Sequence, residues 1–227
     1  MSSYEIIRAG TSHSFPADHA FTQQAVAKGQ GLVLIGADAG TAFVKAGNVD
    51  SRSFVAIELG NECLGVHTGE GRGQEGSNVV GFARFRMGKA DPSNLIELVK
   101  QPQTSADALA AAKTAFEAAG FKVAVCNDFP GRIVNRLVRP YLNAALRRLD
   151  EKLASADDMD KTLCLGLGYP EGPISLLERT GLAEHFDVTS ELHAALGQEA
   201  YVPARRAQVA KQRAEQAKEP SALQRVA

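Results

Sequence analysis

The sequence predicts an α/β domain followed by an all-α domain, and three observations support this prediction. Residues 1–126 contain six short runs rich in β-prone residues, separated by glycine-rich or helical connections. Two of these runs contain the apolar stretches LVLI and FVAI, which are typical of strands buried on both faces of a parallel sheet. After Asp128 the apolar residues recur with a helical period instead.

The first domain is predicted to contain six strands, at Tyr4–Ile7, Gly31–Ile35, Phe54–Leu59, Val79–Phe85, Leu95–Val99 and Lys122–Val125. A crossover helix is predicted from about Ala106 to Ala119, because Thr104 and Asp107 have capping-box spacing and Gly120 can end the helix. The polar segment 69–78 scatters its glycines between charges, which favours a mobile surface turn over a phosphate cradle.

The second domain is predicted to begin with a long helix. Asp128 can cap it and Pro130 fits its first turn, while Pro140 should bend it. Its apolar residues form one stripe: Ile133, Val134, Leu137, Val138, Tyr141, Leu142, Ala145, Leu146 and Leu149. This stripe is wider than one neighbouring helix normally covers, so part of it is available for a partner or for further helices of the same chain.

Three more helices are expected after the long one. Ser155 with Asp158 caps the first of them, and the glycines at 166 and 168 end it. The segment YPEGP then turns the chain into a short helix with Ile174, Leu176 and Leu177, and another helix follows from about Ala183 to Leu196. The tail 201–227 is polar nearly all round and is expected to be a solvated, partly frayed helix. The predicted domains are therefore 1–126, 127–200 and 201–227.

Composition excludes several classes of function. With 227 residues, 25 basic and 26 acidic side chains and a net charge of −1, the chain offers no field for nucleic acid. It lacks the roughly 18 consecutive apolar residues of a membrane span and a basic, apolar leader, so a soluble cytoplasmic protein is expected. Cys63, Cys126 and Cys164 are widely spaced, and His13 and His19 lack ligands at metal spacing, so neither disulfides nor a metal site are expected.

The segments NDFPGRIVNRLVRPYLNAALRRL and LGLGYPEGPISLLERTGL, between Asn127 and Leu182, resemble the dimer-forming helical domain of the 3-hydroxyacyl-CoA dehydrogenase family. VVGFARFR with NLIELVKQPQTS, and GLVLIGAD with FVAIELGNECL, resemble later strands of its nucleotide-binding sheet. The resemblance implies a truncated Rossmann-like sheet followed by a helical domain like the C-terminal domain of 6-phosphogluconate dehydrogenase. It also implies hydride transfer between NAD and 3-hydroxyacyl-CoA, a step of fatty acid metabolism.

Carrying the catalytic motif over residue by residue leaves only remnants. Ala83 stands where the family has its catalytic histidine, and a methyl group cannot accept a proton. Glu97 matches the glutamate that orients that histidine, and Asn135 matches the substrate-side asparagine. Glu97 is either such a remnant or a strand-edge carboxylate held by Lys100 or Arg84. Asn135 either faces a cleft or bonds a neighbouring loop.

Other positions of the family's site are changed as well. Its two serines fall on Glu62 and Cys63, and Arg86 replaces the asparagine of the histidine motif. Cys63 and His67 are four residues apart, which would suit a nucleophile and its base. A structural pair is favoured instead, because the sequence shows no third group to orient the histidine.

The cofactor site of the family is not recognisable in the sequence. No G-x-G-x-x-G occurs, and GADAG at 36–40 and GEGRG at 69–73 lack its spacing. Residues 1–30 are too short for the two β-α units of a mononucleotide-binding half. No cofactor is therefore expected, or NAD if the protein is active.

Two functions follow from these observations. The first is a dimeric, dehydrogenase-derived module that has lost hydride transfer, pairs through the helix at 131–149 and binds acyl-CoA or a related carboxylate. The second is a working NAD-dependent 3-hydroxyacyl-CoA oxidoreductase with a site rebuilt from Arg84, Arg86 or Cys63 and a cofactor loop at 36–40. A regulatory or scaffold subunit of a larger enzyme is a third possibility and shares the first one's lack of chemistry.

Overall fold

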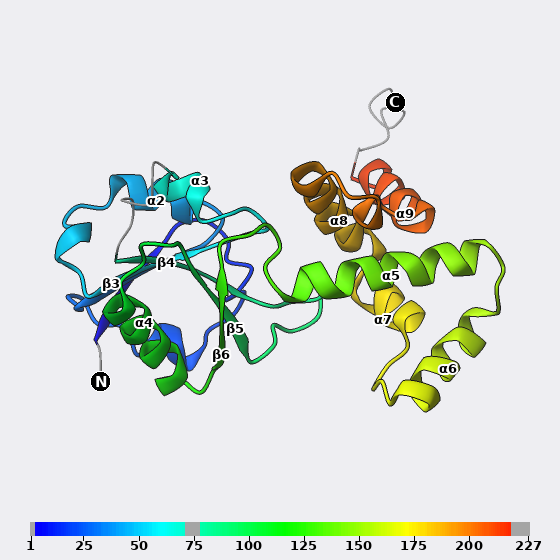
Figure 1. The fold of residues 1–227 in the computed structure, drawn as a ribbon, viewed down its shortest axis with the longest axis horizontal. Helices are drawn as coiled ribbons and strands as arrows, with labels where there is room; N and C mark the ends of the chain where they lie inside the picture. The colour runs from blue at the N-terminus through cyan, green and yellow to red at the C-terminus, as the bar shows by residue number, and fades with distance from the viewer. Residues whose placement is uncertain (1–2, 71–77, 219–227) are drawn as a thin grey trace, which may run out of the picture. The chain divides into compact units, whose positions relative to one another are not determined.

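The computed structural model describes residues 3–70 and 78–218, which form two compact units (Figure 1). The sheet unit contains residues up to Arg86 and the segment Asp91–Val134. The helical unit contains Met87–Ala90 and the chain from Asn135 onward. Most of the segment predicted to be a mobile surface turn, residues 71–77, lies outside the described residues.

The sheet unit is built on six strands that lie in sequence order, β1-β2-β3-β4-β5-β6. The strands are β1 Tyr4–Arg8, β2 Gly31–Ile35, β3 Phe54–Glu58, β4 Val79–Arg84, β5 Leu95–Lys100 and β6 Lys122–Asn127. All six predicted strands are present, and β2 and β3 are buried at every position, as their uninterrupted apolar runs indicate. The predicted fold class, a Rossmann-like sheet followed by helices, is confirmed.

The sheet is mixed rather than wholly parallel as predicted. Strands β1 to β4 are parallel, β4 pairs with β5 antiparallel, and β6 is parallel to β5. The reason is the short connection 85–94, because a parallel crossover needs roughly a dozen residues or more and usually a helix. The carboxyl ends of β5 and β6 therefore lie at the opposite edge of the sheet from those of β1 to β4.

Helices cover both faces of the sheet. Helix α4 (Ala106–Ala118) packs Ala112 and Phe116 onto one face, where Phe21 of the short helix α1 (Ala20–Gln23) joins the same core. The other face is covered by three short elements, α2 (Ala39–Lys45), the 3-10 turn η1 (Val49–Ser51) and α3 (Gly65–Thr68). Helix α4 does not use the predicted capping box, because its N-cap is Ser105 and the Thr104 hydroxyl accepts the Gln101 N–H instead.

The helical unit consists of α5 (Val134–Asp150), α6 (Ala156–Leu167), α7 (Pro173–Thr180), α8 (Leu182–Leu196), the 3-10 turn η2 (Glu199–Tyr201) and α9 (Arg205–Gln216). Ser155 caps α6 by accepting the Asp158 N–H at 3.1 Å, which confirms the predicted cap. Gly168 ends α6 in the left-handed conformation, whereas Gly166 lies inside the helix.

Asp128 does not cap α5 as predicted. Its carboxylate accepts the N–H groups of Leu64 and Gly65 at 2.7 and 2.8 Å, and so caps α3. Helix α5 begins only at Val134, and Pro140 lies inside it. The local spacing correctly indicated that Asp128 caps a helix. It did not indicate that the helix is α3, because α3 is distant from Asp128 in the sequence.

Helix α9 exposes most of its residues, as predicted for a polar tail, but one side of it is packed onto its unit, and residues 219–227 of the predicted tail lie outside the described residues. Ala207 is fully buried, and Lys211 forms an ion pair with Asp187 of α8 at 2.7 Å. Arg205 and Arg206 both reach Asp150 at the end of α5, at 2.9 and 2.7 Å. Few apolar side chains of α9 are buried, as expected, and ion pairs with Asp150 of α5 and Asp187 of α8 add to its contacts.

Candidate functional site

Ala83 and Glu97 lie directly opposite each other on the antiparallel strands β4 and β5. Such residues send their side chains to the same face of a sheet. Ala83 is 7% exposed and Glu97 2% exposed, so a methyl group and a carboxylate are neighbours in the interior. This pair lacks any proton acceptor at position 83.

The Glu97 carboxylate is bound by the backbone where α5 begins. Its Oε1 accepts the N–H groups of Ile133 and Val134, both at 2.8 Å. The first N–H groups of a helix have no partner within the helix. Glu97 therefore binds the N–H groups of residues 133 and 134, which belong to the sheet unit and lead into α5.

Arg132 supplies the charge opposite to Glu97. Its Nε lies 3.7 Å from Oε2 of Glu97, and both side chains are 3% exposed. Its Nη2 donates to the carbonyl of Gly60, while Nε and Nη1 have no hydrogen-bond acceptor among the described residues. Burial lowers the pKa of Arg132, and the Glu97 carboxylate opposes this effect. A guanidinium buried in this way depends on its carboxylate.

Neither of the two residues expected to hold Glu97 does so. Lys100 lies three positions along β5, so strand alternation sends its side chain to the other face. Arg84 donates to the carbonyls of Ser93 and Pro92 at 2.5 and 3.1 Å. Its guanidinium also lies 5.1 Å from the Phe121 ring. These contacts indicate that Arg84 stabilises the fold and does not replace a catalytic group.

Asn135 has a partner on its own helix. Its Oδ1 accepts the Nε–H of Arg139 at 3.1 Å, one turn further along α5. The structure thus brings Asn135 into a buried polar cluster of the helical unit. Glu97 belongs to the sheet unit, and its carboxylate is engaged there by Arg132 and the backbone.

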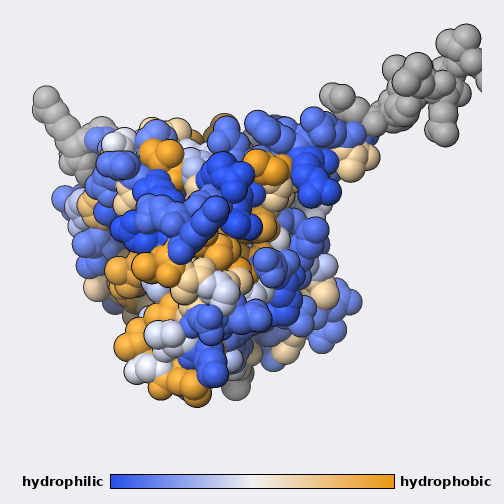
Figure 2. All heavy atoms as spheres, turned by 90° about the vertical axis from the view of Figure 1, so that its right-hand side faces the viewer, coloured by the Kyte–Doolittle hydropathy of each residue, from blue (hydrophilic) through white to orange (hydrophobic). Residues whose placement is uncertain are grey.

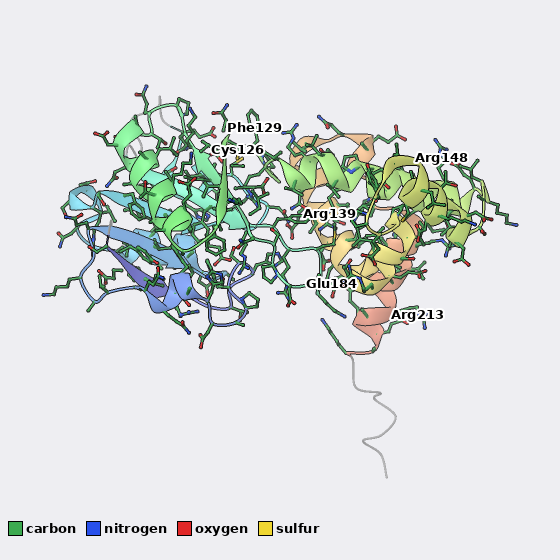
Figure 3. All side chains as sticks on the ribbon, turned by 90° about the horizontal axis from the view of Figure 1, so that it is seen from below. Cys126, Phe129, Arg139, Arg148, Glu184 and Arg213 are labelled. Carbon is green, nitrogen blue, oxygen red and sulfur yellow. The ribbon has the colours of Figure 1, made fainter. Side chains whose placement is uncertain are left out.

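The centre of this cluster is Arg139, which is 1% exposed and lies inside the helical unit (Figure 3). Its Nη1 lies 2.9 Å from Nδ1 of His185, whose Nε2 lies 3.0 Å from Oδ1 of Asn143. A guanidinium can only donate, so His185 accepts through Nδ1 and donates through Nε2. Burial, with the neighbouring Arg139, lowers the pKa of His185 to about 3, and burial lowers that of Arg139 to about 10.

The polar cluster extends along α5 at four-residue spacing. Asn143 donates to the carbonyls of Ala200 and Val202 at 3.0 and 3.1 Å, and Arg147 also donates to Val202 at 2.9 Å. The spacing from Asn135 through Arg139 to Arg147 is present in the sequence, but the sequence-based prediction concerned only the apolar stripe of this helix and Asn135.

Cys63 and His67 are not hydrogen-bonded to each other in the part of the chain that the structure describes. His67 Nε2 lies 3.2 Å from Oε1 of Glu62. Burial is the main cause that raises the pKa of the Cys63 thiol, and the Asp128 carboxylate raises it further, which disfavours the reactive thiolate. The ring of His67 also packs against Gly40, where an added Cβ would lie 2.0 Å from Nδ1. These contacts indicate a structural role for His67.

Glu58, at the end of β3, is a buried carboxylate that the sequence prediction missed. It is 6% exposed and accepts the Ser12 hydroxyl at 2.7 Å and the N–H groups of Ser14 and Gly36, each at 2.7 Å. In the sequence, Glu58 is indicated only as a single acidic residue directly after the apolar run FVAI. A charge at that position must find partners, because an unpaired buried carboxylate is very costly.

A cavity of about 640 Å³ lies at the carboxyl ends of β5 and β6. Its lining consists of Glu70, Lys100, Gln101, Pro102, Asn127, Asp128 and Phe129. Phe129 is 56% exposed, and it is labelled with Cys126 in Figure 3 near the end of β6. Among the described residues, the cavity combines one ammonium group, two carboxylates, an aromatic ring and side-chain amides.

No group of three or more His, Cys, Asp or Glu side chains within residues 3–70 and 78–218 could hold a metal ion. In the same ranges, no helix has the length and apolar character to cross a bilayer. His19 instead caps α1, with Nδ1 accepting the Phe21 N–H at 3.1 Å.

Comparison with known proteins gives a family for the helical unit. Residues 131–223 match the model of the 3-hydroxyacyl-CoA dehydrogenase C-terminal domain. The human mitochondrial hydroxyacyl-coenzyme A dehydrogenase is 42% identical over 88 residues, which cover 39% of this chain and 28% of that protein. A probable 3-hydroxybutyryl-CoA dehydrogenase of Deinococcus radiodurans is 33% identical over 109 residues, or 48% of this chain and 39% of the relative.

The fold of the wider chain has counterparts among solved structures. The (S)-3-hydroxybutyryl-CoA dehydrogenase of Ralstonia eutropha superposes with a TM-score of 0.65 at 23% identity. The superposition covers 80% of this chain and 64% of that one, so the chain matches less than two thirds of its relatives' length. The shared fold is a Rossmann-like sheet followed by a helical unit. Residues 131–223 thus match the C-terminal domain of the 3-hydroxyacyl-CoA dehydrogenase family.

Proposed function

We propose that this protein is a dehydrogenase-derived binding module that has lost hydride transfer. The observation that supports it most directly is the pair on β4 and β5, where Ala83 stands opposite Glu97. In the family, as the resemblance implies, a histidine at this place takes the hydroxyl proton. Here no acceptor stands at position 83, and Glu97 is engaged by Arg132 and by the start of α5.

The cofactor implied by the family does not fit the residues present. A dinucleotide needs free backbone N–H groups at the carboxyl ends of the parallel strands to hold its pyrophosphate. In this chain the N–H groups of Ser14 and Gly36 at that edge are bonded to the Glu58 carboxylate. No step of the proposed function therefore involves NAD.

The ligand we propose is an acyl-CoA or a related carboxylate. The cavity at the carboxyl ends of β5 and β6 supports this, because Lys100 can pair with an anionic group and Phe129 can contact an apolar or planar one. The Asp128 carboxylate in the same lining is already bonded to the N–H groups of Leu64 and Gly65. A volume of about 640 Å³ is in the range of small-molecule sites.

The purified protein is expected to oxidise no NADH with acetoacetyl-CoA, measured by absorbance, while acyl-CoA raises its melting temperature in a thermal-shift assay. A ligand that binds only the native state stabilises it according to its concentration and Kd. The variant Lys100→Met should reduce this shift, and Lys113→Met, on the exposed side of α4, should leave it unchanged. Turnover by the natural protein that is lost in Glu97→Gln would contradict the proposal. Equal melting-temperature shifts for both lysine variants would show that the ligand does not bind in the cavity at Lys100.

We also propose that two copies of the chain associate through the helical unit. Several large apolar side chains there are strongly exposed, and Figure 2 shows hydrophobic atoms gathered on the face it presents. They are Leu137 at 70%, Leu153 at 69%, Leu165 at 77% and Leu167 at 64%. The predicted stripe on α5 is partly covered by its own chain, since Leu142, Ala145 and Leu146 are buried, so the proposed surface uses Leu137 together with these α6 and loop leucines.

The double variant Leu137→Glu/Leu165→Glu is expected to sediment as a monomer under conditions in which the natural protein sediments as a dimer. Charges on this surface would have to be desolvated in the interface, which is costly. Val44→Glu serves as the control, because Val44 is equally exposed, at 77%, but lies on α2 of the sheet unit. A natural protein that remains monomeric in analytical ultracentrifugation at high concentration would sink the proposal.

A further inference from the structure

The segment 9–15, here called the crossing segment, runs over the carboxyl ends of strands β1 to β4. It leaves β1 with the Ala9 N–H donating to the carbonyl of Ile35, the last residue of β2, at 2.7 Å. The Thr11 carbonyl then accepts the Ala37 N–H at 3.0 Å. The chain thus passes from the end of β1 to the end of β2, with the Ala9 N–H and the Thr11 carbonyl bonded to β2 and the turn after it.

The Glu58 carboxylate anchors the middle of the crossing segment at the end of β3. Oε2 accepts the Ser12 hydroxyl and the Gly36 N–H, both at 2.7 Å, and Oε1 accepts the Ser14 N–H at 2.7 Å. Ser12 and Ser14 are 6% and 1% exposed. The carboxylate therefore accepts hydrogen bonds from a buried set of donors in the turns after β1 and β2.

The end of the crossing segment is fixed at β4. The Ser14 hydroxyl accepts the Arg84 N–H at 3.1 Å, and Arg84 Nη1 donates to the Ser14 carbonyl at 3.3 Å. Phe15 follows and stacks on Phe21 with ring centroids 5.5 Å apart. Hydrogen bonds and aromatic packing therefore hold the segment at every strand that it crosses.

At Gly36, the backbone of the crossing segment lies so close that it leaves no room for a side chain. The φ of Gly36 is +114°, and a Cβ added there would lie 2.1 Å from the Ala9 carbonyl oxygen. In dinucleotide-binding folds, a glycine at such a turn lets the backbone approach the pyrophosphate. Here the missing side chain makes room for the crossing segment instead.

We infer that the crossing segment and Glu58 together form a fixed internal plug at the edge where this fold class binds dinucleotides. The Glu58 carboxylate takes the donors that a phosphate would need, and its negative charge repels a phosphate brought near them. This inference goes beyond the proposed function. It concerns only the carboxyl ends of β1 to β4, and it depends neither on Ala83 nor on an acyl-CoA ligand.

The natural protein provides the first test. The N–H groups of Ser14 and Gly36 are expected to exchange slowly with deuterium and to keep their NMR chemical shifts when NAD is added to millimolar concentration. Exchange at the rate of an unprotected amide, or a shift of these two resonances with NAD, would overturn the inference. Turnover in the dehydrogenase assay with both amides still protected would instead reject only the proposed function.

A variant provides the second test. Glu58→Ala leaves three donors without an acceptor, so sodium formate should raise its melting temperature by several degrees more than sodium chloride of equal ionic strength does. Glu5→Ala is the matched control, because it removes a carboxylate from a partly exposed ion pair with Arg52 and should respond equally to both salts. Equal responses in Glu58→Ala would count against the plug, and if this variant fails to fold the exchange measurement decides alone.

Discussion

Glu97→Ala is expected to lower the free energy of unfolding by about 3–5 kcal/mol, the usual cost of removing one partner from a buried ion pair. The substitution leaves the buried Arg132 without its carboxylate and the N–H groups of Ile133 and Val134 without an acceptor. Urea denaturation followed by circular dichroism measures the change. A catalytic remnant without a structural role would lose almost no stability.

Two further variants make this measurement specific to the buried pair. Glu117→Ala removes an exposed carboxylate that lies 3.7 Å from Lys113 on α4, and it should cost only about 0.5 kcal/mol or less. The double variant Glu97→Leu/Arg132→Met should be more stable than Glu97→Ala, since it leaves no unpaired charge. A single variant that loses less than about 1 kcal/mol would show that Glu97 does not anchor α5.

The stability of the helical unit is expected to fall below about pH 6.5 by about 1.4 kcal/mol per pH unit on account of His185. The folded protein holds this imidazole neutral, with its pKa lowered to about 3, whereas the unfolded chain takes up the proton at the ordinary value. The unfolded state therefore binds more protons between these two values, and stability rises with pH through that window. The full contribution is present above pH 6.5.

Comparison of variants isolates the contribution of His185 from those of the carboxylates. In His185→Gln the amide oxygen can accept from Arg139 and the amide nitrogen can donate to Asn143, so the polar cluster is kept without a titrating ring. This variant should show a shallower slope of unfolding free energy against pH from about 6.5 to 4. His193→Gln, on the same helix, should keep the slope of the natural protein. Identical slopes in both variants would refute the assignment.

The strands and most helices could be predicted because their signals are local. LVLI and FVAI have no polar position to expose, so burial on both faces follows directly from the sequence. Ser155 lies three residues before Asp158, and a cap of this kind is complete within one turn. The direction of β5 was missed because it depends on the length of the connection 85–94 rather than on the strand itself.

The partners of the buried charges could not be predicted because they come from distant parts of the chain. Glu97 is bound by Arg132 and Glu58 by Ser12, and neither separation follows a helical or strand period. Asp128 has the spacing of a cap for α5 and serves α3 instead. The family resemblance indicated that Glu97 mattered, but its present role follows only from the contacts in the folded chain.

The contacts of Glu97 leave its carboxylate little capacity to bind a further side chain at position 83. A histidine returned to position 83 would stand beside a carboxylate whose Oε1 already accepts two amides and whose Oε2 faces a guanidinium. Freeing Glu97 to orient such a histidine would thus require at least two coordinated changes, one at Ala83 and one at Arg132. A change of Arg132 alone would leave Glu97 a buried carboxylate without its charge partner.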